Sequence, residues 1–460
     1  MIYNIYGWLH KTAKKFLGYN KHINYRMVNI SDETFSFDKE KILQEWNKND
    51  YINNINQIDF DLNLKDVYPI ENIIRKDSFL FLDDTYGLKE NKEKIVFNVT
   101  EKESTAKWME FVKKSQIPMG FKNGGLHYAG FILEELEWCL PSWVWTNAAI
   151  VRMYCKQGNL DKARNLAEKI LTLQEDNGGW VVRNDYNNMG AIPVLAPNDS
   201  AYIANNCCLV MYNATHESKY LLSAQKCADW IIKSARSDGM VYIGFDTEKK
   251  EWLKENNIVD VGFTAGLFAE LYRITEDSRY YEFLKKFTEA YIKIFYLEDK
   301  KGFATSVNAA DIPQGGMFGR GQAWALEGLI PAYIVTKDEK IKKIINNTIE
   351  TILINQTSSG GWPYNFSRKL MGVDCKATSV VACSLMKWYK LNPNYKELKI
   401  ASQKAYEWCI EHTASNGTCR GGIFSYTVEG AIVHHLYTNT AFVYGSSYAI
   451  ELEEYLRNDD

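Results

Sequence analysis

The stretch QEDNGGW at residues 174–180 returns as QTSSGGW at 356–362, and in both places it ends a helical segment with a Gly-Gly-Trp turn. Related Gly-aromatic turns stand at DGMVY (238–242), KGFA (301–304) and GGIF (421–424). In the shared pattern QxxxGxW, we expect the Gln and the Trp to staple the end of a helix to the turn after it. Turns that recur about every 60 residues indicate a repeat architecture, whose stacked units share one continuous core.

Each turn separates a predicted surface helix from a predicted buried helix. The surface helices carry one apolar stripe opposite a face of Lys and Glu, whereas the buried helices carry apolar and small residues on nearly every face, as in TAGLFAELY. The predicted surface helices span 102–115, 160–174, 219–236, 280–296, 339–356 and 395–413. The predicted buried helices span 140–154, 199–214, 260–275, 320–336, 376–391 and 436–456.

These helices predict an all-α protein built as an (α/α)6 toroid, with the buried helices in an inner ring and the surface helices in an outer ring. Short connections such as YKLNPNY and RITEDSRY are typical of antiparallel neighbours. Ring closure places the surface helix 102–115 beside the last buried helix, 436–456. We assign residues 101–460 to the toroid, and residues 1–100, which show no clear period, to an irregular N-terminal extension.

The composition argues against several classes of protein. With 54 basic and 57 acidic residues the formal net charge is -3, which gives no field to attract nucleic acid. The nine cysteines are scattered and odd in number, as is typical of free thiols in a reducing compartment, so we expect a cytoplasmic protein. No window of about 20 residues is apolar enough for a membrane span. No HExxH, P-loop or GxGxxG motif predicts a metal or a nucleotide cofactor.

Function is predicted to lie at one mouth of the toroid. The buried helices run in the same direction, so their amino ends gather there, and free N–H groups with partial positive charge suit an anionic or hydroxyl-rich ligand. Asp199 and Asp260 open the second and third buried helices and are the candidate catalytic carboxylates. Candidate substrate-binding side chains stand at the other helix starts: Arg320, Gln322, Trp324, Trp143, Asp374, Lys376 and His435. Carboxylates, cations, amides and tryptophans that converge on one mouth predict a carbohydrate site.

Each candidate also has a structural alternative. Asp is among the commonest N-cap residues, so Asp199 and Asp260 could serve only to cap their helices. His435, next to His434, could be a satisfied core side chain at the start of a helix. Arg320 lies in GRGQAW, where the flanking glycines expose backbone and a buried guanidinium needs a partner. The residues alone leave a functional and a structural role open for it.

Three of these stretches resemble the unsaturated uronyl hydrolases, which are the unsaturated glucuronyl and rhamnogalacturonyl hydrolases of glycoside hydrolase families 88 and 105. GRGQAWALEGLIPAYIVTKD (319–338) is similar to the family's Arg-Gly-Gln-Ala-Trp helix and is the most specific match. VDVGFTAGLFAELYRITEDSRY (259–280) is similar to the helix that opens with the family's catalytic Asp, and VDCKATSVVACSLMKWY (373–389) to a later Asp-Ser-Ser-Ala-type helix. The resemblance runs from residue 199 to residue 391 and implies the toroid for the remainder.

The resemblance implies a reaction and a role for each matching residue. Asp260 stands where the family has its catalytic acid/base, and Asp199 where it has a second carboxylate. Arg320 and Trp324 stand where the family contacts the uronate and its ring. In that family one Asp protonates C4 of the C4–C5 vinyl ether left by a polysaccharide lyase and activates the water that adds at C5. The chain departs from the family at Asn198, where a His usually precedes the first Asp.

Other activities remain alternatives to vinyl-ether hydration. One group comprises toroid enzymes that process uronate polysaccharides in surface-polysaccharide biosynthesis, namely an epimerase, a lyase or an inverting glycosidase. A further alternative is a glycan-binding relative that has lost catalysis. Each of these takes an oligosaccharide or polysaccharide, expected to contain uronate, and fold alone does not separate them.

Overall fold

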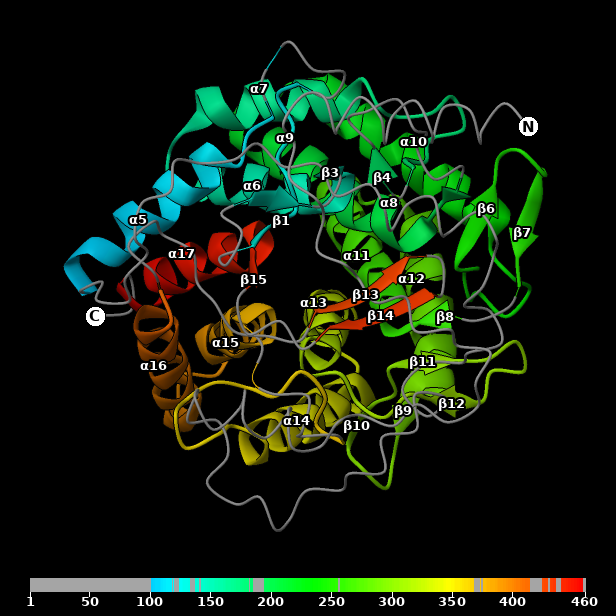
Figure 1. Ribbon diagram of the computed structural model, residues 1–460. Coiled ribbons are helices and arrows are strands. Elements are labelled where there is room, and N and C mark those ends of the chain that lie inside the picture. The colour runs from blue at the N-terminus through cyan, green and yellow to red at the C-terminus, as the bar shows by residue number, and fades with distance from the viewer. Residues whose placement is uncertain are drawn as a thin grey trace.

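The structure, a computed structural model, describes residues 101–457 apart from short gaps, and two concentric layers of helices surround a common axis (Figure 1). The gaps are residues 118, 120–123, 133–136, 140–141, 182, 185–193, 255–256, 368–372, 374, 414–423, 429–430 and 436–439. The inner helices are α6 (Val144–Lys156), the continuous run α8 (Pro197–Ile203), η3 (Ala204–Leu209) and α9 (Val210–Thr215), α11 (Phe263–Thr275), α13 (Gly319–Thr336), α15 (Cys375–Leu391) and α17 (Val443–Arg457). The outer helices are α5 (Glu101–Lys114), α7 (Leu160–Leu171), α10 (Ser218–Ser234), α12 (Ser278–Phe295), α14 (Glu339–Ile354) and α16 (Lys396–Glu411).

The inner ring closes on itself. α6 contacts α8, α8 contacts α11, and the contacts continue through α13, α15 and α17 back to α6. Each outer helix packs on the inner ring, and α5 packs against α17, the last inner helix. The prediction of an all-α (α/α)6 toroid is therefore confirmed, including the place of the first outer helix.

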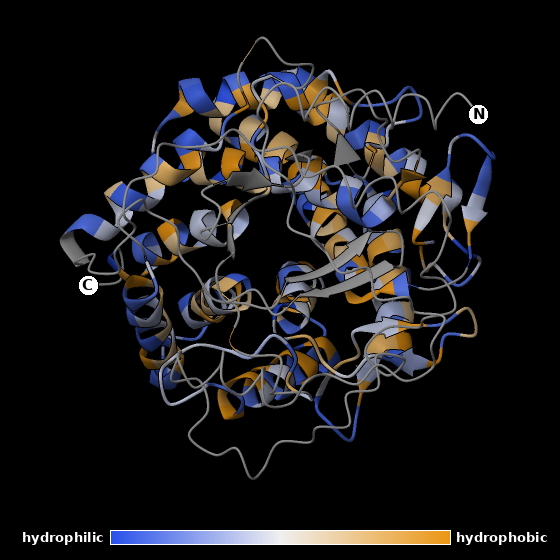
Figure 2. Cartoon of the chain, in the orientation of Figure 1, coloured by the Kyte–Doolittle hydropathy of each residue, from blue (hydrophilic) through white to orange (hydrophobic). Residues whose placement is uncertain are grey.

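The core fills the space between the two rings. Apolar side chains cover the inner helices on most sides and the outer helices on one side, while hydrophilic residues line the outward faces of the outer ring (Figure 2). Gly328 lets α13 approach the start of α11, because a Cβ at this position would lie 2.1 Å from the Gly262 carbonyl oxygen. The small residues of the predicted buried helices thus allow a closely packed interior.

Short strands occupy the connections between helices, and a period of 3.6 residues alone does not predict them. They pair in the orders β15–β1–β2, β3–β4, β5–β6–β7, β9–β10, β8–β11–β12 and β13–β14. Their bounds are β1 (Gly130–Ile132), β2 (Glu137–Cys139), β3 (Ser142–Trp143), β4 (Arg183–Asn184), β5 (Val194–Leu195), β6 (Gly244–Asp246), β7 (Glu251–Leu253), β8 (Asn257–Ile258), β9 (Tyr296–Leu297), β10 (Gly302–Phe303), β11 (Ser306–Val307), β12 (Pro313–Gln314), β13 (Phe424–Val428), β14 (Ala431–His435) and β15 (Thr440–Phe442).

Two inner helices start later than predicted, because the chain before them is extended. β3 pairs with β4, so α6 begins at Val144 rather than at residue 140. β15 pairs with β1, so α17 begins at Val443 rather than at residue 436. His434 and His435 belong to β14, which pairs with β13, and not to the start of a helix as expected.

The stretch at 174–180 forms the predicted staple. The Gln174 amide donates to the Gly178 carbonyl at 2.9 Å, and the Trp180 indole N–H donates to the Ile170 carbonyl near the end of α7 at 3.0 Å. The indole thereby satisfies one of the carbonyls that a helix end leaves without a partner. The second stretch repeats both bonds: Gln356 Nε2 to Gly360 O (2.8 Å) and Trp362 Nε1 to Ile352 O (2.8 Å). Both tryptophans are fully buried.

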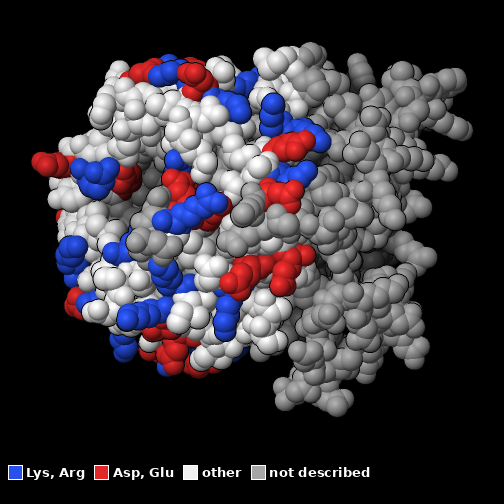
Figure 3. Space-filling model, turned by 90° about the vertical axis from the view of Figure 1, so that its left-hand side faces the viewer, with Lys and Arg blue, Asp and Glu red and all other residues white. Residues whose placement is uncertain are grey.

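The predicted N-terminal extension, residues 1–100, lies outside the described residues. None of the described helices is long and apolar enough to cross a membrane. On the described surface in Figure 3, acidic and basic side chains are interspersed, in keeping with a net charge of -3. The structure shows free thiols at Cys155, Cys207, Cys208, Cys227 and Cys383.

Candidate active site

The two candidate carboxylates lie in the first turns of neighbouring inner helices, but neither is the N-cap residue. Asp199 lies in the first turn of α8, whose N-cap is Ala196. Asp260 lies in η4 (Val259–Gly262), the 3-10 turn that leads into α11, and the N-cap there is Ile258. Neither N-cap residue makes a side-chain cap hydrogen bond, and the Asp260 carboxylate accepts hydrogen bonds from its own backbone N–H and that of Val261, so Asp260 also satisfies donors of this first turn.

The charge of Asp260 reaches the Asp199 carboxyl group. Burial, and after it the charge of Asp260, raises the pKa of Asp199 well above its ordinary value. Burial also raises the pKa of Asp260 to about 6, against a hydrogen bond from Asn198 and the charge of Arg320, which both lower it. The Oδ1 atom of Asp260 is buried with no hydrogen-bond partner among the described residues, although the residue as a whole is partly exposed. The raised pKa of Asp260 brings its titration close to neutral pH, where general acid–base groups act.

The turn that carries Asp260 is held from two sides. Tyr291 of α12 donates its hydroxyl hydrogen to the Val259 carbonyl at 2.8 Å, and the Val259 N–H donates to the Thr305 carbonyl at 3.0 Å. Gly262 lies against the same tyrosine, where a Cβ would be 2.8 Å from the hydroxyl oxygen. Only glycine fits at position 262, so the turn VDVG packs closely on α12. This packing and the two hydrogen bonds fix the position of Asp260.

Arg320 projects from the first turn of α13 over aromatic rings. Its guanidinium carbon lies 4.9 Å from the ring centroid of Trp324 and 5.6 Å from those of Phe318 and Tyr364. A cation held over rings in this way gains most where water is excluded. The charge of Arg320 acts on Asp260, so the structure brings the guanidinium and the carboxylate pair to one place.

Five aromatic rings pack together beneath these groups and are called the floor: Trp145, Tyr202, Phe263, Trp324 and Tyr444. The Trp324 indole N–H donates to the Tyr444 hydroxyl at 3.2 Å, and Phe263 packs edge-on against Trp324 with 5.8 Å between ring centroids. Tyr202 meets Phe263 at 4.6 Å, and Trp145 meets Tyr444 at 4.8 Å, again between ring centroids. An apolar floor with a few polar groups above it is typical of a small-molecule site.

The floor lies one helical turn below the polar groups. Residues three or four positions apart lie on the same face of a helix, so each polar residue is followed by an aromatic ring one turn deeper. The three polar–aromatic pairs are Asp199–Tyr202, Asp260–Phe263 and Arg320–Trp324. The arrangement can bind an anionic group at the guanidinium, hold a sugar ring against the aromatics and exchange a proton at the carboxyl pair.

Gln322 takes a different place from the one predicted. Its amide is fully buried, accepts from the Phe303 N–H at 2.7 Å and donates to the Phe303 carbonyl at 2.9 Å. It therefore anchors a Gly-aromatic turn to α13 and has no atom left to meet a substrate. Equivalent bonds anchor the two stapled turns: Trp180 N to Ser200 Oγ (2.9 Å) and Trp362 N to Thr378 Oγ1 (3.0 Å).

Lys376 and Trp143 lie on the same side of the ring as the carboxylates, at the starts of α15 and α6. The Lys376 ammonium is 3.7 Å from the centroid of the Phe442 ring, and the residue is buried. Trp143 is partly exposed and stacks on Trp145 with 5.9 Å between ring centroids, which leaves it better placed to meet a ligand.

Asp374 and the side chain of His435 lie outside the described residues, so their roles stay predictions. Sequence reasoning also missed Asn198 and Tyr444. Asn198 entered only as a departure from the family pattern, yet its side chain hydrogen-bonds to Asp260. Its position beside Asp199 was a usable signal. The part of the chain that the structure describes contains no group of three or more His, Cys, Asp or Glu residues that could hold a metal ion.

No protein-family model matches the chain, and no curated protein matches it. Solved structures do match. An unsaturated glucuronyl hydrolase specific for heparin superposes with a TM-score of 0.60 at 13% identity, over 78% of this chain and 97% of the other. An α-1,6-mannanase of glycoside hydrolase family 76 from Salegentibacter sp. HEL1_6 gives 0.59 at 13%, over 78% and 99%. The cellobiose 2-epimerase from Spirochaeta thermophila DSM 6192 gives 0.60 at 13%, over 77% and 94%.

The chain is a six-hairpin toroid. The resemblance to the unsaturated glucuronyl hydrolases is confirmed at the level of the fold, and the chain shares that fold with other carbohydrate-active enzymes. At this level of identity the likeness extends to the fold and not to one reaction, because a toroid can carry several. The choice among reactions therefore rests on the side chains at the mouth.

Proposed function

We propose that this toroid is a carbohydrate-active enzyme that hydrates the terminal unsaturated uronyl residue of an oligosaccharide and so releases the neighbouring sugar. One observation carries the proposal: Asp260, with its pKa raised to about 6 by burial, lies beside Asp199 and within the field of Arg320. A carboxyl group that protonates carbon near neutral pH needs a raised pKa. A guanidinium suits the carboxylate of a uronate because its planar fork matches the two oxygens.

In the proposed reaction, Asp260 gives its proton to C4 of the vinyl ether, and positive charge develops at C5 beside the ring oxygen. Its carboxylate then accepts a proton from a water molecule as the water oxygen bonds to C5. The resulting hemiketal opens to a ketone at C5 and a hemiacetal at C1, and the hemiacetal expels the neighbouring sugar. In this scheme Asp199 hydrogen-bonds to the substrate, and the sugar ring packs on Trp324.

The test follows the absorbance of the conjugated double bond in an unsaturated uronyl disaccharide. We expect the wild-type chain to remove that absorbance and Asp260→Asn to lose at least about a thousandfold in rate, since general acid–base groups contribute about 10²–10⁴-fold. Asp299→Asn changes an exposed carboxylate in the turn between β9 and β10; it is the matched control and should keep the rate. A wild-type chain that binds the disaccharide and leaves the absorbance unchanged would refute hydration.

A second candidate is direct hydrolysis of a glycosidic bond. The observation in its favour is the carboxyl pair itself, since a glycosidase usually works with two neighbouring carboxyl groups, and burial raises the pKa of both Asp199 and Asp260. New reducing ends from a saturated oligosaccharide, with Asp199→Asn and Asp260→Asn both inactive, would favour this candidate. An epimerised product would indicate the epimerase, a newly formed double bond the lyase, and binding without any product the non-catalytic relative.

We also infer that the enzyme works in the cytoplasm. Cys207, Cys208, Cys227 and Cys383 are free and buried, so they pack as small apolar side chains instead of forming disulfides. An unsaturated oligosaccharide taken up after lyase action would meet the enzyme there. Fractionation of cells with an antibody against the chain checks the location.

A further inference from the structure

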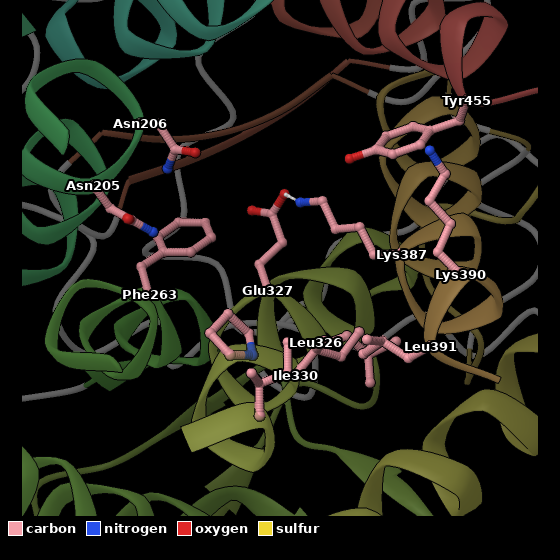
Figure 4. Close-up of a pocket in the computed structure, with 12 residues that line it drawn as sticks. Asn205, Asn206, Phe263, Leu326, Glu327, Ile330, Lys387, Lys390, Leu391 and Tyr455 are labelled. Atoms are coloured by element: carbon pink, nitrogen blue, oxygen red, sulfur yellow. Dashed lines mark hydrogen bonds and ion pairs between the residues drawn. The ribbon is translucent and has the colours of Figure 1, made fainter. Parts of the chain in front are cut away.

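A second hollow lies at the other end of the toroid, near the carboxyl ends of the inner helices. Its volume is about 340 Å³, and residues of η3, α11, α13, α15 and α17 line it (Figure 4). Glu327 follows Arg320 on α13 by seven positions, which places it roughly 10 Å further along the helix axis. Lys390 and Tyr455 lie in the last turns of α15 and α17. The hollow is therefore distinct from the mouth that holds the carboxyl pair.

The deepest polar group in this hollow is an incompletely bonded carboxylate. Glu327 is only 9% exposed. Its Oε1 accepts from the Tyr448 hydroxyl at 2.7 Å and from the Lys387 ammonium at 3.2 Å. Its Oε2 is buried and has no partner among the described residues, and Figure 4 shows the carboxylate between Asn205 and Lys387. A buried carboxylate oxygen without a donor is costly, so a ligand that donates a hydrogen bond here would be stabilised.

The rim of the hollow offers donors. Lys390 is exposed, its ammonium lies 4.8 Å from the centroid of the Tyr455 ring, and it forms no hydrogen bond or salt bridge with a described residue. The Tyr455 hydroxyl oxygen accepts from Lys156 at 2.8 Å, which leaves its own hydrogen to donate. The side chain of Asn205 likewise makes no hydrogen bond to a described residue. These groups suit a ligand that carries acceptor oxygens.

The charged side chains around the hollow favour an anionic ligand over a cationic one. Arg152 and Lys156 bind Glu451 at 2.9 Å each and, against the effect of burial, lower its pKa to about 2, so that carboxylate is neutralised. Arg152 also stands 3.8 Å from Glu327, which Lys387 already pairs. Lys390, whose charge also acts on Glu454 of α17, adds positive charge at the rim.

We propose that this hollow is a second ligand site, for a small hydroxylated acid of the size of one sugar acid. The ligand's carboxylate meets Lys390 and Tyr455, a hydroxyl donates to Glu327 Oε2, and a C–H face lies against Phe263. Phe263 contributes to both sites, since its ring also packs against Trp324 in the floor of the mouth. The proposal does not depend on the reaction at the mouth.

The test measures binding of D-glucuronate by calorimetry to the full chain carrying Arg320→Ala, which removes the anion-binding guanidinium of the mouth. We expect binding to persist in this background, D-glucose to bind at least about tenfold more weakly, and D-glucosamine more weakly still. Adding Lys390→Ala should weaken glucuronate about tenfold, as for the loss of one charge-assisted hydrogen bond. Adding Ile334→Trp, which fills the lining from an exposed position, should abolish binding.

Matched controls are Lys343→Ala and Ile400→Trp, which change exposed residues of the outer ring and should leave binding unchanged. A thermal melt of each variant checks that it is folded. Lys390→Ala and Ile334→Trp lie on different helices, so the test still stands if one of the two variants does not fold. The proposal is overturned if glucuronate does not bind to the Arg320→Ala chain. It is equally overturned if glucose binds as well as glucuronate, or if Lys390→Ala and Ile334→Trp bind like their controls.

Discussion

At the scale of single residues, Asp260 combines a buried oxygen with a partly exposed face, and these two properties predict its pH dependence. Burial raises its pKa to about 6, so the protonated form dominates below that pH. If Asp260 donates the proton to C4, kcat/KM is highest below pH 6 and falls about tenfold per pH unit above it. Burial and the charge of Asp260 raise the pKa of Asp199 as well.

The measurement is the pH profile of kcat/KM on an unsaturated uronyl disaccharide, with Asp299→Asn as the control that should keep the same limb. A rate that rises with pH through 6 would show that the ionised form acts, and would move the assignment of Asp260 from acid to base. The two directions are opposite in sign, so one profile separates them.

The residues that could be predicted from the sequence were those whose place follows from helix direction. Asp199, Asp260 and Arg320 open parallel inner helices, so their convergence needed only the repeat. Gln322 lies two positions after Arg320, but a helix turns about 100° per residue, and this rotation points its amide at the turn carrying Phe303. Tyr444 could not be predicted, because the start of its helix was placed at residue 436 and strand pairing set it at Val443.

At the scale of elements, the glycines in the turns have two separable roles, and a matched pair of substitutions measures them. Gly178, in the first stapled turn, has φ +107°, and a Cβ there would lie 2.4 Å from the Lys226 carbonyl oxygen. Gly158, after α6, has φ +68° with nothing within 4 Å of its Cβ position. Gly158→Ala should cost about 1–2 kcal/mol of unfolding free energy, from backbone strain alone.

Gly178→Ala adds a collision with backbone to that strain, so its free energy of unfolding should fall by at least about 2 kcal/mol more than that of Gly158→Ala. Urea unfolding of the two variants and the wild type makes the comparison. Equal losses would mean that the turn can move away from α10, and that the staple of Gln174 and Trp180 does not fix its position.

The element boundaries show what periodicity supplies and what it omits. The helical period located the helices of both rings to within about four residues at each end, apart from the start of α17, because each helix buries a defined face. The short strands and the π-helical run η3 depend on pairing and packing between distant segments, as in β1 with β15, which are some 300 residues apart. The local sequence of a segment does not show which distant segment it will pair with.

At the scale of the whole molecule, helices within residues 101–457 close the ring. α5 packs on α17 and α16, the Trp108 ring is fully buried, and its indole N–H donates to Thr413 Oγ1 at 2.9 Å. A chain that begins at residue 101 should therefore keep the helical circular dichroism of the toroid and a single cooperative melt.

A chain that begins at residue 116 lacks α5 and exposes the apolar face of α17. Because each large buried side chain contributes about 1.5–3 kcal/mol, the loss should reach several kcal/mol and lower the melting temperature clearly. If both chains melt alike, α5 is not the element that closes the ring; if both fail to fold, residues 1–100 are part of the toroid's core and the assignment of an extension is wrong.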